Sequence, residues 1–304
     1  MIAGDDALLA LGRLLRDSGY RFVTVTPASH ARVNSRPENA VARSVRDVFG
    51  WSRPFPRTLL SDEMLSLLDS AGCLIEDGEL LKSTVRFSTR DDMIFVHSAF
   101  PTTGADAVFF GPDTYRYLSL LERLAPTAKR AIDIGAGSGA GGLFIANACG
   151  SVVLSDVNDV ALRYSRINAE LNDISNVEIV KSNVLREVDG DFDLIIANPP
   201  YLIDDDARLY RDGGGTFGER LSLEIVRQSL ARLTSGGRLI LYSASAIVDG
   251  VDTFRKAVDP LLTEKSADIR YSELDPDVFN EELDREAYRR AERIAVIALD
   301  VRVR

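Results

Sequence analysis

The sequence predicts two domains: a doubly wound α/β sheet over residues 105–304, preceded by a smaller α+β domain over residues 1–104. Three observations lead to this fold class. Short apolar segments alternate with helix-length segments from Lys129 onwards, which is typical of a parallel sheet with helices on both faces. A glycine-rich turn joins the first of these strands to a helix. Before residue 105 the order differs, since helical segments come first and a hairpin follows.

The composition is that of an ordinary globular protein. The chain has 304 residues, of which 45% are hydrophobic and 27% charged, and its formal net charge is -10. This length suits about two domains. Proteins that bind nucleic acid as their main task usually carry a basic face, so the acidic balance argues against that class, although it is compatible with a local basic patch.

The sequence shows no signal for a metal site, a disulfide framework, a membrane span or export. Its two cysteines, Cys73 and Cys149, belong to no CxxC pair, so we expect neither a structural metal nor disulfides. A run of about eighteen apolar residues does not occur, so we expect no membrane span. Asp5 and Asp6 stand where a signal peptide would be basic. We therefore expect a reduced, cytoplasmic setting.

Residues 1–104 are predicted to form a winged-helix-like domain that recognises the substrate. Helical periodicity comes first, and two segments of alternating character then predict a hairpin. Ser61 is a suitable N-cap for the third helix. The predicted elements are helices over 7–16, 38–49 and 61–72, and a hairpin of 84–88 with 93–98.

A basic stretch lies inside this domain. Residues 31–57 contain six arginines against only Glu38 and Asp47. The stretch can be a patch for phosphates or for an acidic partner. It can also be a solvated helix face with salt bridges to the acidic second domain, and we favour this second interpretation. The arginines are Arg32, Arg36, Arg43, Arg46, Arg53 and Arg57.

Residues 105–304 are predicted to form the sheet domain. Each predicted strand is short, apolar and bounded by polar residues. A convincing helix is missing before the last strand, since 281–291 is polar and short, so that strand can lie antiparallel near the sheet edge. The predicted strands are 130–134, 151–155, 177–181, 192–197, 238–243, 269–274 and 293–301, and the helices are 140–148, 158–171, 219–233 and 251–262.

A glycine-rich turn with the sequence AIDIGAGSGA follows the first strand of the sheet. Glycines are needed where the backbone takes a positive φ or approaches a ligand closely. Gly135, Gly137 and Ala140 satisfy the spacing of a dinucleotide-binding turn, but the pattern alone does not specify the ligand.

Two acidic residues narrow the choice of ligand. Asp156 ends the second strand, where a carboxylate can accept hydrogen bonds from the ribose of a dinucleotide or of S-adenosylmethionine, or can act as a charge at a helix start. Asp133 lies inside the first strand, a position that is usually apolar in dehydrogenases. Its carboxylate can orient the glycine turn or meet a cationic ligand end such as the amino group of a methionine moiety.

The run Asn198-Pro199-Pro200-Tyr201 follows the buried strand 192–197. Two consecutive prolines neither continue a central strand nor start a helix smoothly, so they form a stiff loop. The loop stands at the carboxyl edge of the sheet, where open α/β folds bind their ligands. An amide, two rigid carbonyls and an aromatic ring are therefore held together at a ligand-binding edge.

These motifs resemble those of class I S-adenosylmethionine-dependent methyltransferases, and within them the HemK-type protein-glutamine N5-methyltransferases. Residues 133–139 resemble their first motif, Asp156 their ribose-binding acid, and Asn198-Pro199-Pro200-Tyr201 their amino-methylating motif. Further similarities are Gly111-Pro112-Asp113-Thr114 to an upstream Pro-Arg-Pro-x-Thr segment, residues 181–185 to the adenine-contacting motif, and residues 221–239 to the helix, turn and fifth strand. The resemblance covers about residues 105–304.

The resemblance implies a Rossmann-like, seven-stranded methyltransferase sheet with S-adenosylmethionine as its cofactor. It also departs from the family, since Asn183 replaces the usual Asp, Gly111 replaces an Arg, and the N-terminal region is not the helical bundle of the glutamine enzymes. By resemblance, the cofactor-binding residues are Thr114, Asp133, Gly135, Ala136, Gly137, Gly139, Asp156, Val157, Asn183, Val184 and Asn198, and the catalytic residues are Asn198, Pro199, Pro200 and Tyr201.

The leading hypothesis is methyl transfer to a planar nitrogen of a protein side chain or of a small amino-acid-like molecule. The Asn198 side-chain oxygen and the Pro199 carbonyl can hold the acceptor nitrogen, and Tyr201 can stack on the flat group. The loop 202–218 suits a mobile lid, and its acidic run 204–206 can attract a cationic substrate or simply be solvated. Alternatives are methylation of adenine or guanine amino groups in RNA or DNA, an NAD-dependent dehydrogenase, and a non-catalytic nucleotide-binding module.

Overall fold

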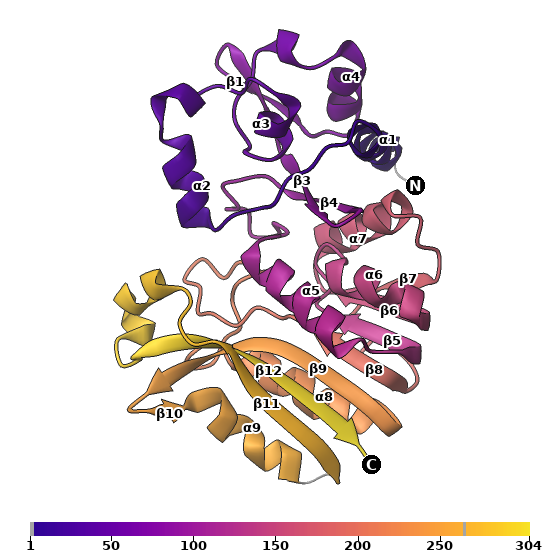
Figure 1. The fold of residues 1–304 in the computed structure, drawn as a ribbon, viewed down its shortest axis with the longest axis vertical. Helices are drawn as coiled ribbons and strands as arrows, with labels where there is room; N and C mark the ends of the chain where they lie inside the picture. The colour runs from indigo at the N-terminus through magenta and orange to yellow at the C-terminus, as the bar shows by residue number, and fades with distance from the viewer. Residues whose placement is uncertain (1–2, 264–265) are drawn as a thin grey trace.

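The protein is built of a small N-terminal domain mounted on one end of a larger sheet domain (Figure 1). The structure, a computed structural model, describes residues 3–263 and 266–304. Residues 1, 2, 264 and 265 of the two predicted domains therefore lie outside the described residues. Within the described ranges, a helix with the length and apolar character needed to cross a membrane is not found.

The larger domain contains the predicted sheet. Seven strands follow the order β11-β12-β9-β8-β5-β6-β7, and the short β10 pairs with β9. The strands β9, β8, β5, β6 and β7 are mutually parallel, whereas β12 runs antiparallel to both of its neighbours, which confirms the expected antiparallel last strand. The bounds are β5 (Ala128–Ile134), β6 (Cys149–Asp156), β7 (Val177–Lys181), β8 (Phe192–Ala197), β9 (Leu233–Val248), β10 (Val251–Asp252), β11 (Ala267–Asp275) and β12 (Arg293–Val303).

Helices cover both faces of the sheet, as the doubly wound prediction requires. Apolar residues of α5 (Pro112–Leu124) and α6 (Ala140–Ile145) pack on one face, and those of α8 (Arg220–Arg232) and α9 (Thr253–Thr263) pack on the other. A 3-10 turn, η3 (Ala146–Ala148), continues α6, and α7 (Asp159–Leu171) lies on the α5–α6 side. The prediction omitted α5. Between β11 and β12 the polar segment forms only two 3-10 turns, η4 (Asn280–Asp284) and η5 (Glu286–Tyr288).

The N-terminal domain is a small α+β unit, and its likeness to a winged helix stays a prediction. The first helix, the helix capped by Ser61 and the predicted hairpin are confirmed. A helix before residue 35 and a second hairpin were not predicted. The elements are α1 (Ala3–Asp17), α2 (Pro27–Asn34), η1 (Pro37–Asn39), α3 (Val45–Phe49), η2 (Arg57–Leu59), α4 (Asp62–Ser70), β1 (Leu74–Asp77), β2 (Leu80–Ser83), β3 (Val85–Arg90) and β4 (Met93–Ser98).

The predicted helix over 38–49 is wrong, because the chain is helical there only from Val45 to Phe49. The Ser44 side chain accepts a hydrogen bond from the Asp47 N–H at 3.2 Å and so starts a new helix in the middle of the predicted one. Just before this cap, the Ala42 N–H donates to the Pro54 carbonyl at 2.8 Å, which draws the backbone away from a helical path.

The two domains share one apolar core through α7. Ala161, Tyr164, Ile167 and Leu171 of this helix belong to the same buried cluster as the N-terminal helices. Polar contacts reinforce the junction, since Arg163 forms an ion pair with the buried Asp5 at 2.5 Å. The N-terminal domain is therefore fastened to the helix that begins just beyond the second strand of the sheet.

Side-chain amides of α7 also extend the β4 edge. The Asn168 side chain accepts from the Val96 N–H at 2.7 Å and donates to the Val96 carbonyl at 3.0 Å. One helical turn later, Asn172 does the same for Ile94, at 3.0 and 2.8 Å. Residues four apart on a helix face the same side, as do residues two apart on a strand, so the two asparagines can match one strand edge. The hairpin is thereby held in register on α7.

Candidate active site

The glycine turn and the Asn-Pro-Pro-Tyr loop meet at the carboxyl edge of the sheet. Ile134 of β5 and Ala197 of β8 are paired in adjacent parallel strands. The residues that follow them, Gly135 and Asn198, therefore leave the sheet side by side. Asn198 is half-buried, and its side-chain amide forms no hydrogen bond within residues 3–263 and 266–304. Its oxygen thus remains available to a ligand at this edge.

The glycine turn has the backbone that its sequence predicts. Gly135, Gly137 and Gly139 all have positive φ, at 69, 56 and 79°. The N–H groups of Gly135 and Ala136 both donate to the Ser155 carbonyl, at 2.9 and 3.0 Å, which fastens the turn to β6. A side chain at Gly135 would face open space, so the backbone here is accessible to a ligand. This open, folded turn fits a nucleoside-containing cofactor.

Asp156 ends β6 and holds the glycine turn from this neighbouring parallel strand. Its carboxylate accepts hydrogen bonds from the N–H groups of Gly137 and Asn158, both at 2.9 Å. Burial raises its pKa. The start of α7 is capped by Asn158, whose side chain accepts from the Val160 N–H, so Asp156 is not the cap of that helix. Next to it, Val157 exposes 42% of its surface, an apolar contact suited to an adenosine group.

Asp133 lies beneath the glycine turn rather than on the surface. Only 2% of the residue is exposed, and its carboxylate accepts from the Gly142 N–H of α6 at 2.7 Å. Burial raises its pKa to about 7. Of the two roles expected from the sequence, these contacts match the one in which Asp133 orients the turn and the following helix.

The segment after β7 carries a strained residue. Val184 is buried and has a φ of 59°, a conformation that is rare for a β-branched side chain and costs about 1–3 kcal/mol. Beside it, Asn183 donates its backbone N–H to Glu187 at 2.7 Å while its side chain is exposed. The exposed Asn183 side chain can therefore meet a ligand, whereas Val184 shapes the loop behind it.

Thr114 lies in the first turn of α5 and helps to cap it, since its hydroxyl accepts from the Gly111 N–H at 3.3 Å. The preceding Asp113 is buried, and the Tyr242 hydroxyl donates to it at 3.0 Å. Burial and Asp113 together raise the pKa of Tyr201 well above its usual value. Asp113 and Tyr242 thus surround Tyr201, and the sequence analysis missed both as parts of the site. For Asp113, the sequence held one indication: it directly precedes Thr114 in the upstream segment that resembles a family motif.

Tyr201 is only 8% exposed, and its ring lies among those of Tyr242 and Phe279, with centroids 6.2 and 6.1 Å away. Its part as a platform for a flat acceptor stays a prediction. Two glycines of the following loop allow this packing. A side chain at Gly213 would overlap the Gly218 carbonyl, and one at Gly218 would come within 2.2 Å of the Tyr201 carbonyl. The loop therefore supports the Tyr201 backbone directly.

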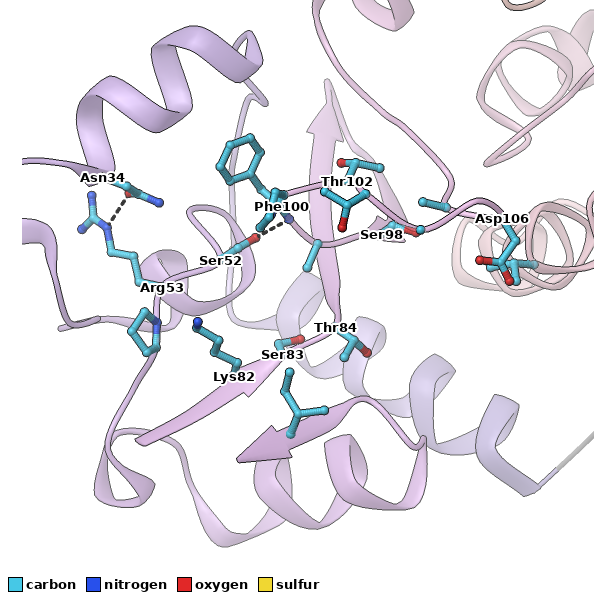
Figure 2. A pocket seen from close by; sticks show the side chains of 18 of the residues that line it. Asn34, Ser52, Arg53, Lys82, Ser83, Thr84, Ser98, Phe100, Thr102 and Asp106 are labelled. Atoms are coloured by element: carbon cyan, nitrogen blue, oxygen red, sulfur yellow. Dashed lines mark hydrogen bonds between the residues drawn. The ribbon is translucent and has the colours of Figure 1, made fainter. Parts of the chain in front are cut away.

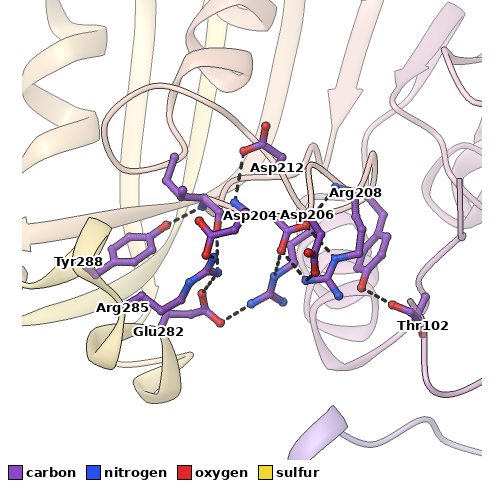
Figure 3. A network of polar contacts seen from close by, with 12 residues as sticks. Thr102, Asp204, Asp206, Arg208, Asp212, Glu282, Arg285 and Tyr288 are labelled. Atoms are coloured by element: carbon purple, nitrogen blue, oxygen red, sulfur yellow. Dashed lines mark hydrogen bonds and ion pairs between the residues drawn. The ribbon is translucent and has the colours of Figure 1, made fainter. Parts of the chain in front are cut away.

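The loop 202–218 is fastened by an extensive polar network (Figure 3). Asp204 is buried and paired with Arg208, which lowers its pKa to about 2. Arg211 reaches Glu282, and Arg285 donates to the Ile203 carbonyl at 2.8 Å and to Asp205 at 2.6 Å. Much of the acidic run is thus neutralised by arginines of the loop itself and of the η4–η5 segment.

The loop also contacts the segment that leads from the N-terminal domain. The Tyr210 hydroxyl donates to the Thr102 carbonyl at 2.9 Å, as Figure 3 shows, and its ring stacks on Phe109 at 5.5 Å. The Leu209 N–H donates to the Ala105 carbonyl at 3.0 Å. The segment 202–218 therefore contacts the Asn-Pro-Pro-Tyr loop, the η4–η5 segment and the connecting residues 102–109 at the edge of the site.

Comparison with known proteins agrees with this geometry. The pattern of the methyltransferase small domain family matches residues 117–248. A release factor glutamine methyltransferase of Lactococcus lactis is 32% identical over 146 residues, which cover 43% of this chain and 53% of that protein. One of Deinococcus radiodurans is 33% identical over 157 residues, covering 46% and 55%. The chain thus spans about half the length of these curated relatives.

Solved structures with the same fold extend further along the chain. Trm5b from Pyrococcus abyssi has 18% identity and a TM-score of 0.52, over 76% of this chain and 62% of its own. M. jannaschii TYW2, solved in complex with AdoMet, has 13% identity and a TM-score of 0.51, over 75% and 88%. The sheet order and the open glycine turn agree with these comparisons: residues 117–248 match the methyltransferase small domain family, and about half of the chain is similar to the HemK-like release factor glutamine methyltransferases.

Proposed function

We propose that this protein transfers a methyl group from S-adenosylmethionine to a planar nitrogen of a protein side chain or of a small amino-acid-like molecule. One observation supports this above others: Gly135 and Asn198 leave two adjacent, paired strands at the same edge. A cofactor held over the glycine turn and an acceptor held at Asn198 would be neighbours. Asp156 ends the strand next to the turn and the exposed Val157 follows it, where they would fit the ribose and the adenine.

The chemistry at Asn198 is one of positioning. An amide nitrogen is a poor nucleophile because its lone pair is delocalised into the carbonyl. The Asn198 side-chain oxygen and the Pro199 carbonyl would accept its two N–H hydrogens and fix the direction of the lone pair. S-adenosylmethionine, when bound, supplies a methyl group already activated by the sulfonium. A strong base is therefore not required of the protein.

A protein acceptor is supported by the two relatives described above, which are both named release factor glutamine methyltransferases. Their similarity is confined to about half of either chain, so it supports the reaction more directly than the acceptor. The NAD-dependent dehydrogenase and the non-catalytic module receive no such support, since the family match is to methyltransferases.

Replacement of Asn198 by alanine tests this proposal. We expect Asn198→Ala to reduce methyl transfer by about 100-fold or more, because the side-chain oxygen that would accept a hydrogen bond from the substrate nitrogen is lost. S-adenosylmethionine binding should change by less than about threefold. Radiolabelled methyl transfer to protein, RNA and small-molecule fractions measures the first quantity, and calorimetry measures the second. Asn280→Ala, at an exposed position in η4, is the matched control. Loss of cofactor binding in a folded variant, or binding of NAD instead, would contradict the assignment.

A base amino group in RNA or DNA is the second candidate acceptor. Among the described residues, ion pairs within the basic stretch 31–57 are confined to Arg53 with Asp47, so the predicted salt bridges of this stretch to the second domain are absent. The arginines without ion pairs can bind phosphates. Trm5b, a solved neighbour, shares only its fold with this chain and adds no further support for a nucleic-acid acceptor. A steep fall of affinity with added salt, together with label in the RNA fraction, would favour this acceptor.

A further inference from the structure

A groove separates the N-terminal domain from the segment that leads into the sheet domain (Figure 2). Its volume is about 700 Å³, within the range of sites that hold small molecules or short peptide segments. One wall comes from α2, η1 and the residues around Arg53, and another from Lys82 to Thr84. The third wall is the connecting segment 98–107, and Val160 and Tyr164 of α7 complete the lining.

The groove is lined by both polar and apolar side chains, and several of the polar ones are fixed. Arg53 donates to Asn34 at 3.0 Å and pairs with Asp47 at 2.7 Å. The Ser52 hydroxyl accepts from the Phe100 N–H at 3.0 Å, a contact that Figure 2 shows. The apolar part includes Ile75, a large side chain with 47% of its surface accessible. Such a surface offers hydrogen bonds to a backbone and apolar contacts to side chains.

Exposed arginines flank the groove. Arg36 and Arg43 stand within four residues of the lining residues Asn39 and Ala40. Across residues 3–263 and 266–304, neither forms an ion pair with a carboxylate, and the same is true of Arg32, Arg46 and Arg57. In a chain of net charge -10, these five arginines outnumber the carboxylates of Glu38 beside the groove and Asp106 within it, so the region has an excess of positive charge. An excess of charge of one sign beside a groove attracts a ligand of the opposite sign.

Aromatic faces suited to stacking nucleic-acid bases are already in use here. The Trp51 ring packs on Phe22 and His30, with Arg53 over its face. The Phe100 ring stacks on His30 at 4.1 Å. Proteins that hold single-stranded nucleic acid combine positive charge with free aromatic platforms, whereas arginine beside exposed apolar residues is typical of protein interfaces. The surface therefore favours an acidic peptide over RNA.

We propose that this groove and its arginine rim bind an extended acidic segment of the protein acceptor. Carboxylates of the segment would pair with Arg36 and Arg43, its backbone would follow the amide and hydroxyl groups of the groove, and an apolar side chain would cover Ile75. The inference rests on the proposed function, because it supplies the docking site for that reaction's protein substrate.

The groove is joined to the catalytic edge by its own wall. The Asp106 carbonyl accepts from the Asn158 side chain at 2.7 Å, two residues beyond Asp156. The Thr102 carbonyl accepts from Tyr210 of the loop 202–218. A peptide in the groove would therefore lie against a segment that is bonded both to the cofactor side and to the acceptor side of the site. Docking here would fix the position of the acceptor relative to Asn198.

Fluorescence anisotropy with a labelled deca-glutamate peptide, at about 50 mM salt, tests the inference. We expect Arg36→Glu/Arg43→Glu to weaken peptide binding by about tenfold or more, because two attractions become repulsions. Arg289→Glu/Arg290→Glu, a matched charge change at exposed positions remote in sequence from the groove, should alter binding by less than about twofold. Ala40→Trp fills the groove without changing charge and should also weaken binding, by about fivefold.

Three results would overturn the inference: no peptide binding by the wild type, unchanged binding in Ala40→Trp, or displacement of the peptide by a deca-uridine RNA that binds more tightly. Calorimetry with S-adenosylmethionine on the same preparations separates this inference from the proposed function. If the cofactor fails to bind while the peptide binds at the groove, the proposed function fails and the docking site remains. If the cofactor binds and the groove variants have no effect, only the docking site fails.

Discussion

The glycine turn at the catalytic edge and the junction of the N-terminal domain differ in the sequence separation of the residues that their hydrogen bonds join. In the glycine turn, the bonds join residues close in sequence or on neighbouring strands, such as Asp156 to Gly137 and Asp133 to Gly142. At the junction with the N-terminal domain, they join residues far apart, as when Asn168 holds Val96 across 72 positions. A local constraint selects unusual residues at fixed spacing, whereas a distant one leaves no local pattern.

This difference explains why the glycine turn and the double-proline loop could be predicted from the sequence, whereas the domain junction could not. Glycines with positive φ and a double proline have few alternative explanations. An asparagine on a helix, by contrast, is ordinary unless its strand partner is known. The two regions should therefore respond differently to single substitutions, with stability most sensitive at the domain junction and catalysis most sensitive at the edge.

The largest effect is expected for Asn168→Ala at the junction. Asn168 is fully buried and bonds to the Val96 N–H, the Val96 carbonyl and the Ser138 carbonyl. Removing its side chain leaves three buried polar groups without a partner, so we expect the free energy of unfolding to fall by about 3 kcal/mol. Urea denaturation measures this loss, and hydrogen exchange at the Val96 amide reports where it occurs.

Asn172→Ala is the matched control, since it removes the equivalent pair of bonds to Ile94 at a half-buried position where water can replace them. We expect a loss of only about 1 kcal/mol. Equal losses in the two variants would mean that burial does not set the strength of the junction.

The next effect is catalytic and concerns Gly218. Its φ is 94°, and an added Cβ would lie 2.2 Å from the Tyr201 carbonyl. Gly218→Ala must therefore displace the loop or the Asn-Pro-Pro-Tyr backbone, and a displacement near 1 Å costs about 100-fold in rate. We expect that loss in methyl transfer, with cofactor binding largely retained because the glycine turn is untouched.

Gly236→Ala separates overlap from backbone strain. Gly236 also has a positive φ, 77°, but a Cβ there would meet nothing within 4 Å. We expect this variant to lose about 1 kcal/mol of stability while its rate stays within about twofold of the wild type. A rate loss as large as that of Gly218→Ala would mean that strain, and not contact with Tyr201, is responsible.

The same contrast defines what could be predicted. The sheet, its antiparallel last strand and the meeting of Gly135 with Asn198 follow from local patterns and the register of parallel strands. The helix predicted over 38–49 fails because Ser44 caps a new helix and Ala42 bonds to distant Pro54, neither of which periodicity reveals. Asp113 and Tyr242 were missed because they surround Tyr201 from α5 and β9, which only the folded chain brings together.

The smallest effect is expected in the loop 202–218, which the sequence indicates as a lid and the structure shows to be fastened by arginines. Arg285 is 25% exposed and its partner Asp205 is 85% exposed, so their ion pair is worth under about 1 kcal/mol. Arg285→Ala should therefore leave global stability within about 1 kcal/mol of the wild type, yet speed hydrogen exchange of amides 202–218, because its bond to the Ile203 carbonyl is also lost. Arg227→Ala removes a comparable pair on α8 without touching the loop. If exchange in the loop is equally slow in both variants, the buried Asp204–Arg208 pair alone holds it, and the loop belongs with the rigid edge rather than with the parts that move.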